Sequence, residues 1–380
     1  MGLFSLFKKA LGNADEDKAS SAKPSESDEM NVNSGPGEEP KEENLQNNQA
    51  LEEGDSPAEE PEAAPEPECS IYEYIKTHTE DGRVPEGFCI PWIQGMWAPG
   101  AQDGVCLYHM VPLEPDPARE QQILHALELM SSEESLDYVR VVFDIFEEIE
   151  EKIPIVRLYD EIIQVMIAHK ADLNLENLLN YGDWLISYGV SLLSVKLGLT
   201  LISPFNVPFV EEVMTEFGVY DEFTYYAARV LSLPTWDNCN VWVGKLDVDN
   251  GVPTWQSGND KLFNLAKNVR GWGRIHAVEY LRPETQEIRD WLLYEGADND
   301  IIPQYSADVC LQKSGAESRL DSALSAKEFE AIGELIQIAL ESGPRPGITD
   351  GERILPKFLA KGEEFPIDPR LKQMILDSTE

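Results

Sequence analysis

The stretch Gly198-Leu-Thr-Leu-Ile202, followed by Ser203-Pro204, shows a pattern that returns three times along the chain. In each copy a small residue is followed four positions later by an apolar residue, and then by a residue that ends a helix. The other copies are Ala227 with Leu231 before Pro234, Ala277 with Leu281 before Pro283, and Ala307 with Leu311 before Gly315. Small residues on a helix face allow neighbouring helices to pack closely.

The spacing of these small residues predicts the architecture. The intervals are 29, 50 and 30 residues, so the middle one fits a repeat with an insertion of about 20 residues. Periods of this size are typical of stacked helix pairs. We therefore expect an all-α fold, an α-solenoid of stacked antiparallel helix pairs.

Composition limits the choice of partners. The 380 residues include 30 basic and 70 acidic side chains, a net charge of −40, and 42% are hydrophobic, which is enough for a core. Such a surface repels phosphate backbones, so we expect no nucleic-acid partner. Basic proteins, cationic peptides and divalent metals remain open, as does the absence of any electrostatic partner. The five cysteines form no CxxC pair, which favours reduced thiols and a cytoplasmic setting.

Composition also predicts the domain organisation. Residues 1–68 are acidic and poor in large apolar residues, so we expect a disordered tail. Residues 69–117 are expected to form an irregular N-terminal cap. It begins with a short helical face of Ile71, Tyr72, Tyr74 and Ile75 that ends at Asp81-Gly82, and from Val84 to Pro117 aromatic residues alternate with glycine and proline, which suggests an irregular or short-stranded segment. Residues 118–343 carry the helical repeats, and residues 344–380 form a C-terminal cap or arm.

The first residues allow two interpretations. In residues 3–11 an apolar face lies beside Lys8 and Lys9, which would suit transient contact with a membrane surface or a partner. A frayed start to the tail is the alternative and is favoured. No apolar run in the chain approaches the roughly 18 residues of a spanning helix, so we expect no transmembrane segment.

The familiar catalytic and cofactor motifs are missing. The five histidines lack the spacing of a helical metal pair, and GxGxxG, the P-loop and GxSxG are absent. Asp247-Val-Asp249-Asn-Gly251 is similar to a calcium-binding loop, but Gly258 stands where the distal glutamate belongs, which favours a simple turn. We expect no cofactor and no metal.

Aromatic residues concentrate in the second half of the chain. Stacked helices need large rings to fill the seams between layers, which is the favoured role. If some line a concave face, they would form a groove for a peptide or a flat apolar ligand. The candidate binding residues are Trp236, Trp242, Trp255, Trp272, Arg274, His276 and Trp291.

Two family resemblances bear on function. The phrase Gly271-Trp-Gly-Arg-Ile-His-Ala-Val-Glu-Tyr-Leu281 resembles the second half of a HEAT-type repeat, which implies a protein-binding scaffold. Ser70-Ile-Tyr-Glu-Tyr-Ile-Lys with Asp81-Gly-Arg-Val-Pro-Glu resembles bacterial proteins that carry the name limonene hydroxylase. The second resemblance implies monoterpene oxidation. The sequence shows no recognisable set of ligands for haem, flavin or iron, and the resemblance assigns no catalytic residue.

We therefore expect a non-catalytic binding protein that recognises another protein through the concave face or acidic rim of its helical stack. The alternative is an enzyme, an oxidoreductase acting on an apolar small molecule, with its site among the aromatic residues from Trp236 to Trp291.

Overall fold

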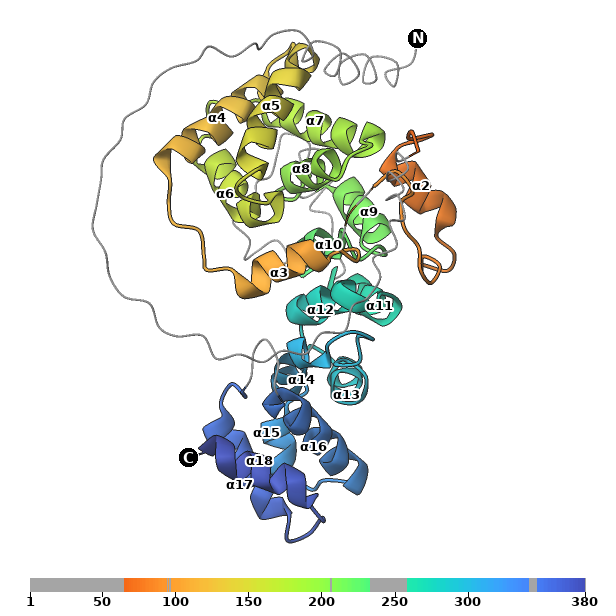
Figure 1. Ribbon diagram of the computed structural model, residues 1–380, viewed down its shortest axis with the longest axis vertical. Coiled ribbons are helices and arrows are strands. Elements are labelled where there is room, and N and C mark those ends of the chain that lie inside the picture. Colours follow the sequence, from red (N-terminus) through yellow and green to blue (C-terminus); the bar gives the residue numbers. More distant parts are fainter. Residues whose placement is uncertain are drawn as a thin grey trace, which may run out of the picture. The chain divides into compact units, whose positions relative to one another are not determined.

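The computed structural model describes residues 65–379, apart from 94, 96, 206, 233–257 and 342–346. These residues form α-helices (Figure 1), short 3-10 helices and an isolated bridge between Glu80 and Arg83, and the all-α class is confirmed. The expected tail up to residue 64, its segment 3–11 and the turn at 247–251 lie outside the described residues. None of the described helices combines the length and apolar character that crossing a bilayer requires.

The helices of the first half follow one another closely along the chain. They are α2 (Ile71–His78), α3 (Ala101–His109), α4 (Pro117–Ser131), α5 (Val139–Glu150), α6 (Ile155–Ala168), α7 (Leu175–Tyr188), α8 (Leu192–Ile202), α9 (Pro208–Phe217) and α10 (Thr224–Leu231), with a 3-10 helix at Ser135–Tyr138. The helices of the second half are α11 (Gly258–Asn268), α12 (Gly271–Tyr280), α13 (Gln286–Tyr294), α14 (Ala307–Lys313), α15 (Ala316–Leu320), α16 (Ala326–Leu340), α17 (Gly351–Lys361) and α18 (Pro369–Thr379), with a 3-10 helix at Pro303–Tyr305.

Helix α8 is the most deeply buried element. Every residue from Leu193 to Ile202 is buried, and the helix contacts α6, α7 and α10. Its packing on α7 uses two facing glycines: a Cβ atom on Gly198 would lie 2.9 Å from the carbonyl oxygen of Gly182. The two helices therefore meet backbone to backbone, as the small residue in the first sequence pattern predicts.

The other copies of the pattern are also interior. Ala227, Ala277 and Ala307 have no exposed surface. The apolar partners four positions later, Ile202, Leu231, Leu281 and Leu311, are fully buried as well. The repeated pattern thus marks contacts of the core.

Residues 84–117 differ from the expected irregular segment, because α3 lies within them. Gly100 adopts a left-handed conformation (φ 72°) just before the helix, and Pro99 precedes it, so these two breakers mark the start of α3. Residues 101–109 contain no proline, and Gly104 makes room for the ring of Trp272, with which a Cβ atom would clash at 2.1 Å. A tertiary contact thus explains a glycine that reads as a breaker in the sequence.

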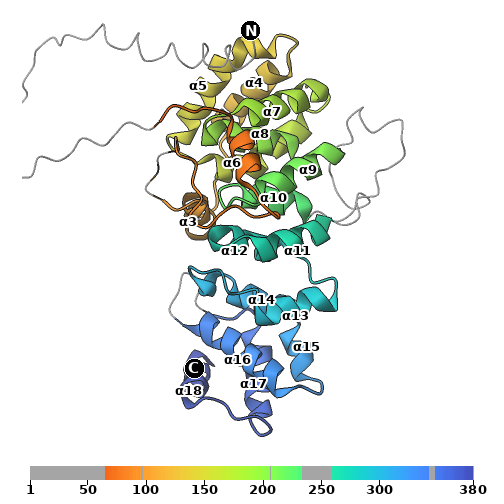
Figure 2. The same ribbon diagram turned by 90° about the vertical axis from the view of Figure 1, so that its right-hand side faces the viewer.

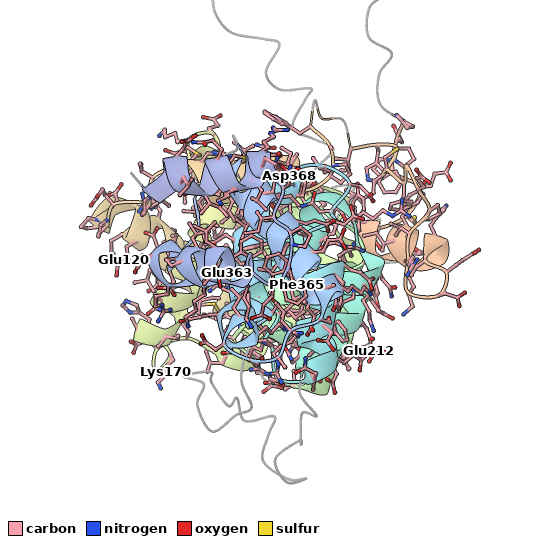
Figure 3. All side chains as sticks on the ribbon, turned by 90° about the horizontal axis from the view of Figure 1, so that it is seen from below. Glu120, Lys170, Glu212, Glu363, Phe365 and Asp368 are labelled. Atoms are coloured by element: carbon pink, nitrogen blue, oxygen red, sulfur yellow. The ribbon has the colours of Figure 1, made fainter. Side chains whose placement is uncertain are left out.

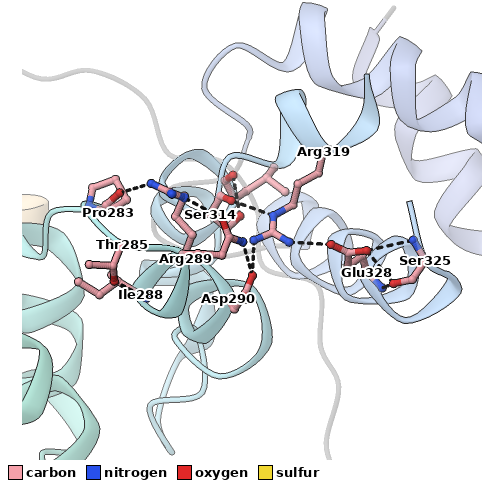
Figure 4. Close-up of polar contacts among 11 residues, drawn as sticks. Pro283, Thr285, Ile288, Arg289, Asp290, Ser314, Arg319, Ser325 and Glu328 are labelled. Carbon is pink, nitrogen blue, oxygen red and sulfur yellow. Dashed lines mark hydrogen bonds and ion pairs between the residues drawn. The ribbon is translucent and has the colours of Figure 1, made fainter. Parts of the chain in front are cut away.

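The second half is joined by polar contacts between helix ends. Arg319 of α15 donates to Asp290 of α13, to Glu328 of α16 at 2.7 Å and to the carbonyl of Ser314 at 3.0 Å (Figure 4). Glu328 also completes a capping box with Ser325 at the start of α16. One guanidinium therefore connects three helices.

Successive helices in this half contact near neighbours in the chain. Helix α11 packs against α12, α13 against α14, α15 against α17, and α16 against α18 (Figure 2). Contacts between helices that are adjacent or next but one in the chain are compatible with a helical repeat fold.

The close contact at Gly198 predicts the effect of one added methyl group. Gly198→Ala places a Cβ atom against backbone and against Ile186, and such overpacking costs about 1–3 kcal/mol. The better helix propensity of alanine returns at most about 1 kcal/mol. We expect a lower free energy of unfolding, measured by urea denaturation followed by circular dichroism.

The control is Gly351→Ala, where the added Cβ atom has only ordinary contacts at 3.6 Å with Ile348 and Leu355. This variant should be as stable as the wild type. Equal stability of Gly198→Ala and the wild type would contradict the backbone-to-backbone packing of α7 and α8.

Candidate functional site

The structure describes four of the seven predicted binding residues. Trp272, Arg274 and His276 lie on α12, and Trp291 lies on α13. Trp236, Trp242 and Trp255 lie outside the described residues. The described four do not form one open aromatic surface, because Trp272, His276 and Trp291 are buried.

Trp272 fills the space between α12 and α3. Its ring lies 4.9 Å from the ring of Tyr305 and 6.1 Å from that of Tyr108, centroid to centroid. Ala101 and Ile275 complete this cluster. The structure thus gives Trp272 a contact in the interior, and its role in binding a partner stays a prediction.

His276 is a neutral interior residue. Its side chain is 1% exposed, and its Nδ1 lies 3.4 Å from the hydroxyl of Tyr108. Burial, and secondarily the charge of Lys196, lowers the pKa of His276 to about 3. The imidazole is therefore uncharged at neutral pH.

Arg274 and Trp291 form a separate pair. The guanidinium of Arg274 lies 5.8 Å from the centre of the Trp291 ring and donates to the carbonyls of Val269 and Asp298 at 3.1 and 2.6 Å. Trp291 also meets Phe263 edge to face at 5.5 Å. Arg274 thus holds the end of α11 and the loop after α13, and any role in binding stays a prediction.

A buried ion cluster surrounds Lys196 of α8. Lys196 Nζ lies 2.8 Å from Asp103 Oδ2 and 2.5 Å from Glu222 Oε1, and all three side chains are nearly or fully buried. Glu222 also accepts a hydrogen bond from the backbone amide of Gly100 at 2.6 Å. We call Lys196, Asp103 and Glu222 the Lys196 ion cluster. It joins α8, the start of α3 and the turn before α10.

The charges of this cluster depend on one another. Burial alone would lower the pKa of Lys196, but the charges of Asp103 and Glu222 and their hydrogen bonds raise it above its ordinary value. Burial also raises the pKa of Asp103, an effect that the nearby lysine partly offsets. Lys196 therefore stays charged, and removing it would leave two carboxylates uncompensated.

A groove opens on the surface between α3, α4 and α6. Its volume is about 640 Å³, within the usual range of ligand sites. One wall is the non-helical connector 110–116, which runs from α3 to α4 beside α6 (Figure 1). The lining residues are Cys106, Leu107, Met110, Val111, Pro112, Leu113, Glu114, Pro115, Asp116, Arg119, Glu120, Val156, Arg157, Asp160, Glu161, Gln164, Val165, Ala168 and Tyr225. We call this site the connector groove.

Two arginines hold the connector in place. Arg119 Nε donates to both carboxylate oxygens of Glu161, at 3.0 and 2.9 Å, and its Nη2 donates to the carbonyl of Glu114 at 2.9 Å. Arg157 donates to the carbonyl of Val111. Both guanidiniums that line the groove thus donate hydrogen bonds to partners within the chain.

The thiol that lines the connector groove is not activated. Cys106 lines the groove and is 8% exposed, and burial, followed by the charge of Asp103, raises the pKa of this thiol. The thiol is therefore protonated at neutral pH and is a poor nucleophile. Among the described residues, no group of three or more histidine, cysteine, aspartate or glutamate side chains could hold a metal ion.

Neither of these features was identified from the sequence, although signals for both are present. Lys196 is the one charged residue in the apolar run Leu192–Ile202, so it requires buried carboxylate partners. Pro112, Pro115 and Pro117 follow α3 closely and exclude a helical connection.

Comparison with known proteins adds no family. No family model matches the chain, and neither a curated protein nor a solved structure matches it. The resemblances to HEAT-type repeats and to limonene hydroxylase therefore rest on the residues quoted for them.

The Lys196 ion cluster predicts a large loss of stability when its cation is removed. Lys196→Met leaves Asp103 and Glu222 buried without a counter-charge, and breaking such a pair costs about 3–5 kcal/mol. Lys170→Met, on the exposed end beyond α6, is the control and should leave the free energy of unfolding unchanged. Equal stability of the two variants would contradict the role of the cluster.

His276 predicts a specific dependence of stability on pH. The unfolded chain protonates this residue near pH 6.5 and the folded chain only near pH 3, so acidification through this window favours unfolding. The expected contribution is a loss of about 1.4 kcal/mol for each pH unit below about 6.5.

In His276→Gln this contribution is absent, so the free energy of unfolding should fall less steeply between about pH 6.5 and about pH 4. The exposed His125→Gln should keep the wild-type slope. Identical slopes for both variants, from urea denaturation at several pH values, would show that His276 is not held neutral.

Proposed function

We propose that this chain is a non-catalytic binding protein that holds a basic, extended segment of a partner protein in the connector groove. The observation that carries the proposal is the charge of the lining. Five carboxylates (Glu114, Asp116, Glu120, Asp160 and Glu161) face two guanidiniums (Arg119 and Arg157). A cationic partner complements this excess of negative charge.

The carboxylates differ in availability. Glu161 is engaged by Arg119, and Asp160 is engaged by Arg229, which donates to both of its carboxylate oxygens. Glu114 and Glu120 are exposed, and within the part of the chain that the structure describes neither side chain has a cationic partner. These two side chains are the strongest candidates for contact with a bound cation.

The apolar wall of the groove fits the same occupant. Met110 and Val111 are 46% and 79% exposed, next to Pro112 and Leu113 of the connector. Lysine and arginine carry aliphatic stems that pack along apolar surface while their charged ends reach a carboxylate. A basic segment can therefore use both parts of the groove.

The wider scaffold is proposed to be a HEAT-like stack. Packing between near neighbours from α11 to α18 supports this proposal, as do the buried small residues of the repeated pattern. The free cysteines Cys69, Cys89, Cys106 and Cys310 support a reducing, cytoplasmic setting. The partner would then be a basic protein of the same compartment.

Binding of a basic peptide tests the proposed function. The probe is a fluorescein-labelled peptide of about 10 residues that alternates lysine and alanine, measured by fluorescence anisotropy at low salt. Glu120→Lys should weaken binding about fivefold, because an attraction of about 0.5 kcal/mol is replaced by a repulsion of similar size. Added salt should weaken binding by the wild type.

The matched control is Glu212→Lys, an exposed glutamate of α9 outside the groove (Figure 3). It changes the net charge of the protein by the same amount as Glu120→Lys, so affinity within about twofold of wild type is expected. Equal weakening by both variants would mean that the peptide follows overall charge, and the connector groove would lose its assigned role.

A further inference from the structure

A second pocket lies at the other end of the chain, between α16, α17 and α18. Its volume is about 390 Å³, and it is separate in sequence from the connector groove. Three aromatic rings form its apolar side: Phe329 stacks on Phe358 at 4.4 Å and on Phe365 at 5.0 Å, centroid to centroid. Figure 3 looks onto this end of the chain, with Phe365 and Asp368 labelled. We call this site the α16–α18 pocket.

Gly333 forms part of the floor. It is buried in α16, and a Cβ atom there would lie 3.1 Å from Phe358 and 3.4 Å from Leu371. A side chain at this position would therefore press against the aromatic stack. Phe329 and Phe358 are buried, so Phe365, which is partly exposed, is the most accessible of the three rings.

The rim of the pocket is acidic. Glu330, Glu334 and Asp368 line it, and no lysine or arginine does so among the described residues. Asp368 caps the N-terminus of α18, because its carboxylate accepts hydrogen bonds from the amides of Arg370 and Leu371 at 2.8 and 3.2 Å.

Glu330 and Glu334 differ from Asp368. Both are exposed on the same face of α16, and neither forms an ion pair within the described part of the chain. Like charges four residues apart destabilise a helix slightly, so a bound cation would relieve a cost that the free helix carries.

We propose that the α16–α18 pocket binds a basic amphipathic helix of a partner protein, with one large apolar side chain packed against Phe365 at the accessible side of the aromatic stack. An apolar anchor suits the aromatic floor, and lysines one turn away suit Glu330 and Glu334. Helices that dock in this way present anchors at intervals of three and four residues. The site is independent of the connector groove and needs an anchor that the groove does not require.

A helical peptide tests this proposal with the full chain. The probe is a labelled peptide of about 15 residues with leucine and phenylalanine on one face and lysine on the others, measured by anisotropy. Glu334→Lys should weaken binding about fivefold. A second peptide, in which alanine replaces the apolar anchors, should bind the wild type at least about tenfold more weakly.

Two control variants carry the same change in net charge. Glu352→Lys lies on α17 outside the lining, and Glu120→Lys lies in the connector groove. Both should bind the helical peptide within about twofold of wild type. Circular dichroism melts of all three variants establish that they are folded.

The outcomes separate this proposal from the proposed function. If Glu120→Lys or Glu352→Lys lowers the affinity for the helical peptide as much as Glu334→Lys does, attraction to the overall charge explains binding and the pocket is not the site. Equal affinity of the peptides with and without apolar anchors would overturn the pocket as well. The affinity for the lysine-alanine peptide should be lowered by Glu120→Lys and unchanged by Glu334→Lys. The two experiments therefore test the two sites independently.

Discussion

Lys196 places a positive charge in the middle of a buried apolar helix, and the surrounding structure is arranged to satisfy it. Asp103 of α3 and Glu222 before α10 reach the same ammonium group, and Glu222 also holds the backbone of Gly100. Because a buried charge without partners is very costly, the position of α3 against α8 is closely constrained. The connector groove depends on this constraint, since α3 fixes one end of the connector and Arg119 fixes the other.

Most helices could be predicted from the sequence because they follow hydrophobic periodicity and end at proline or glycine. The sequence pattern at Gly198, Ala227, Ala277 and Ala307 coincides with buried helix contacts. Helix α3 could not be predicted in the same way. Gly104 reads as a breaker, and only the ring of Trp272, which is far away in the sequence, explains it.

The candidate site was harder to predict than the fold. Composition suggests a role for the aromatic residues, but burial of Trp272, His276 and Trp291 is a tertiary property that no single stretch of sequence reports. The excess of negative charge kept a basic partner among the alternatives, but composition does not show where on the surface the unpaired carboxylates lie. The position of the unpaired charge depends on which glutamates already form ion pairs. Glu161 is paired with Arg119, whereas Glu120 is exposed and has no cationic partner in the described part of the chain.

Amide hydrogen exchange with and without a lysine-rich peptide is the most direct test of the central claim, that the connector groove is the binding surface. The account predicts slower exchange in the connector 110–116 and in α6 when the peptide is present, with α2 unchanged. Slower exchange spread evenly over acidic surfaces, or confined to helices that do not line the groove, would contradict it.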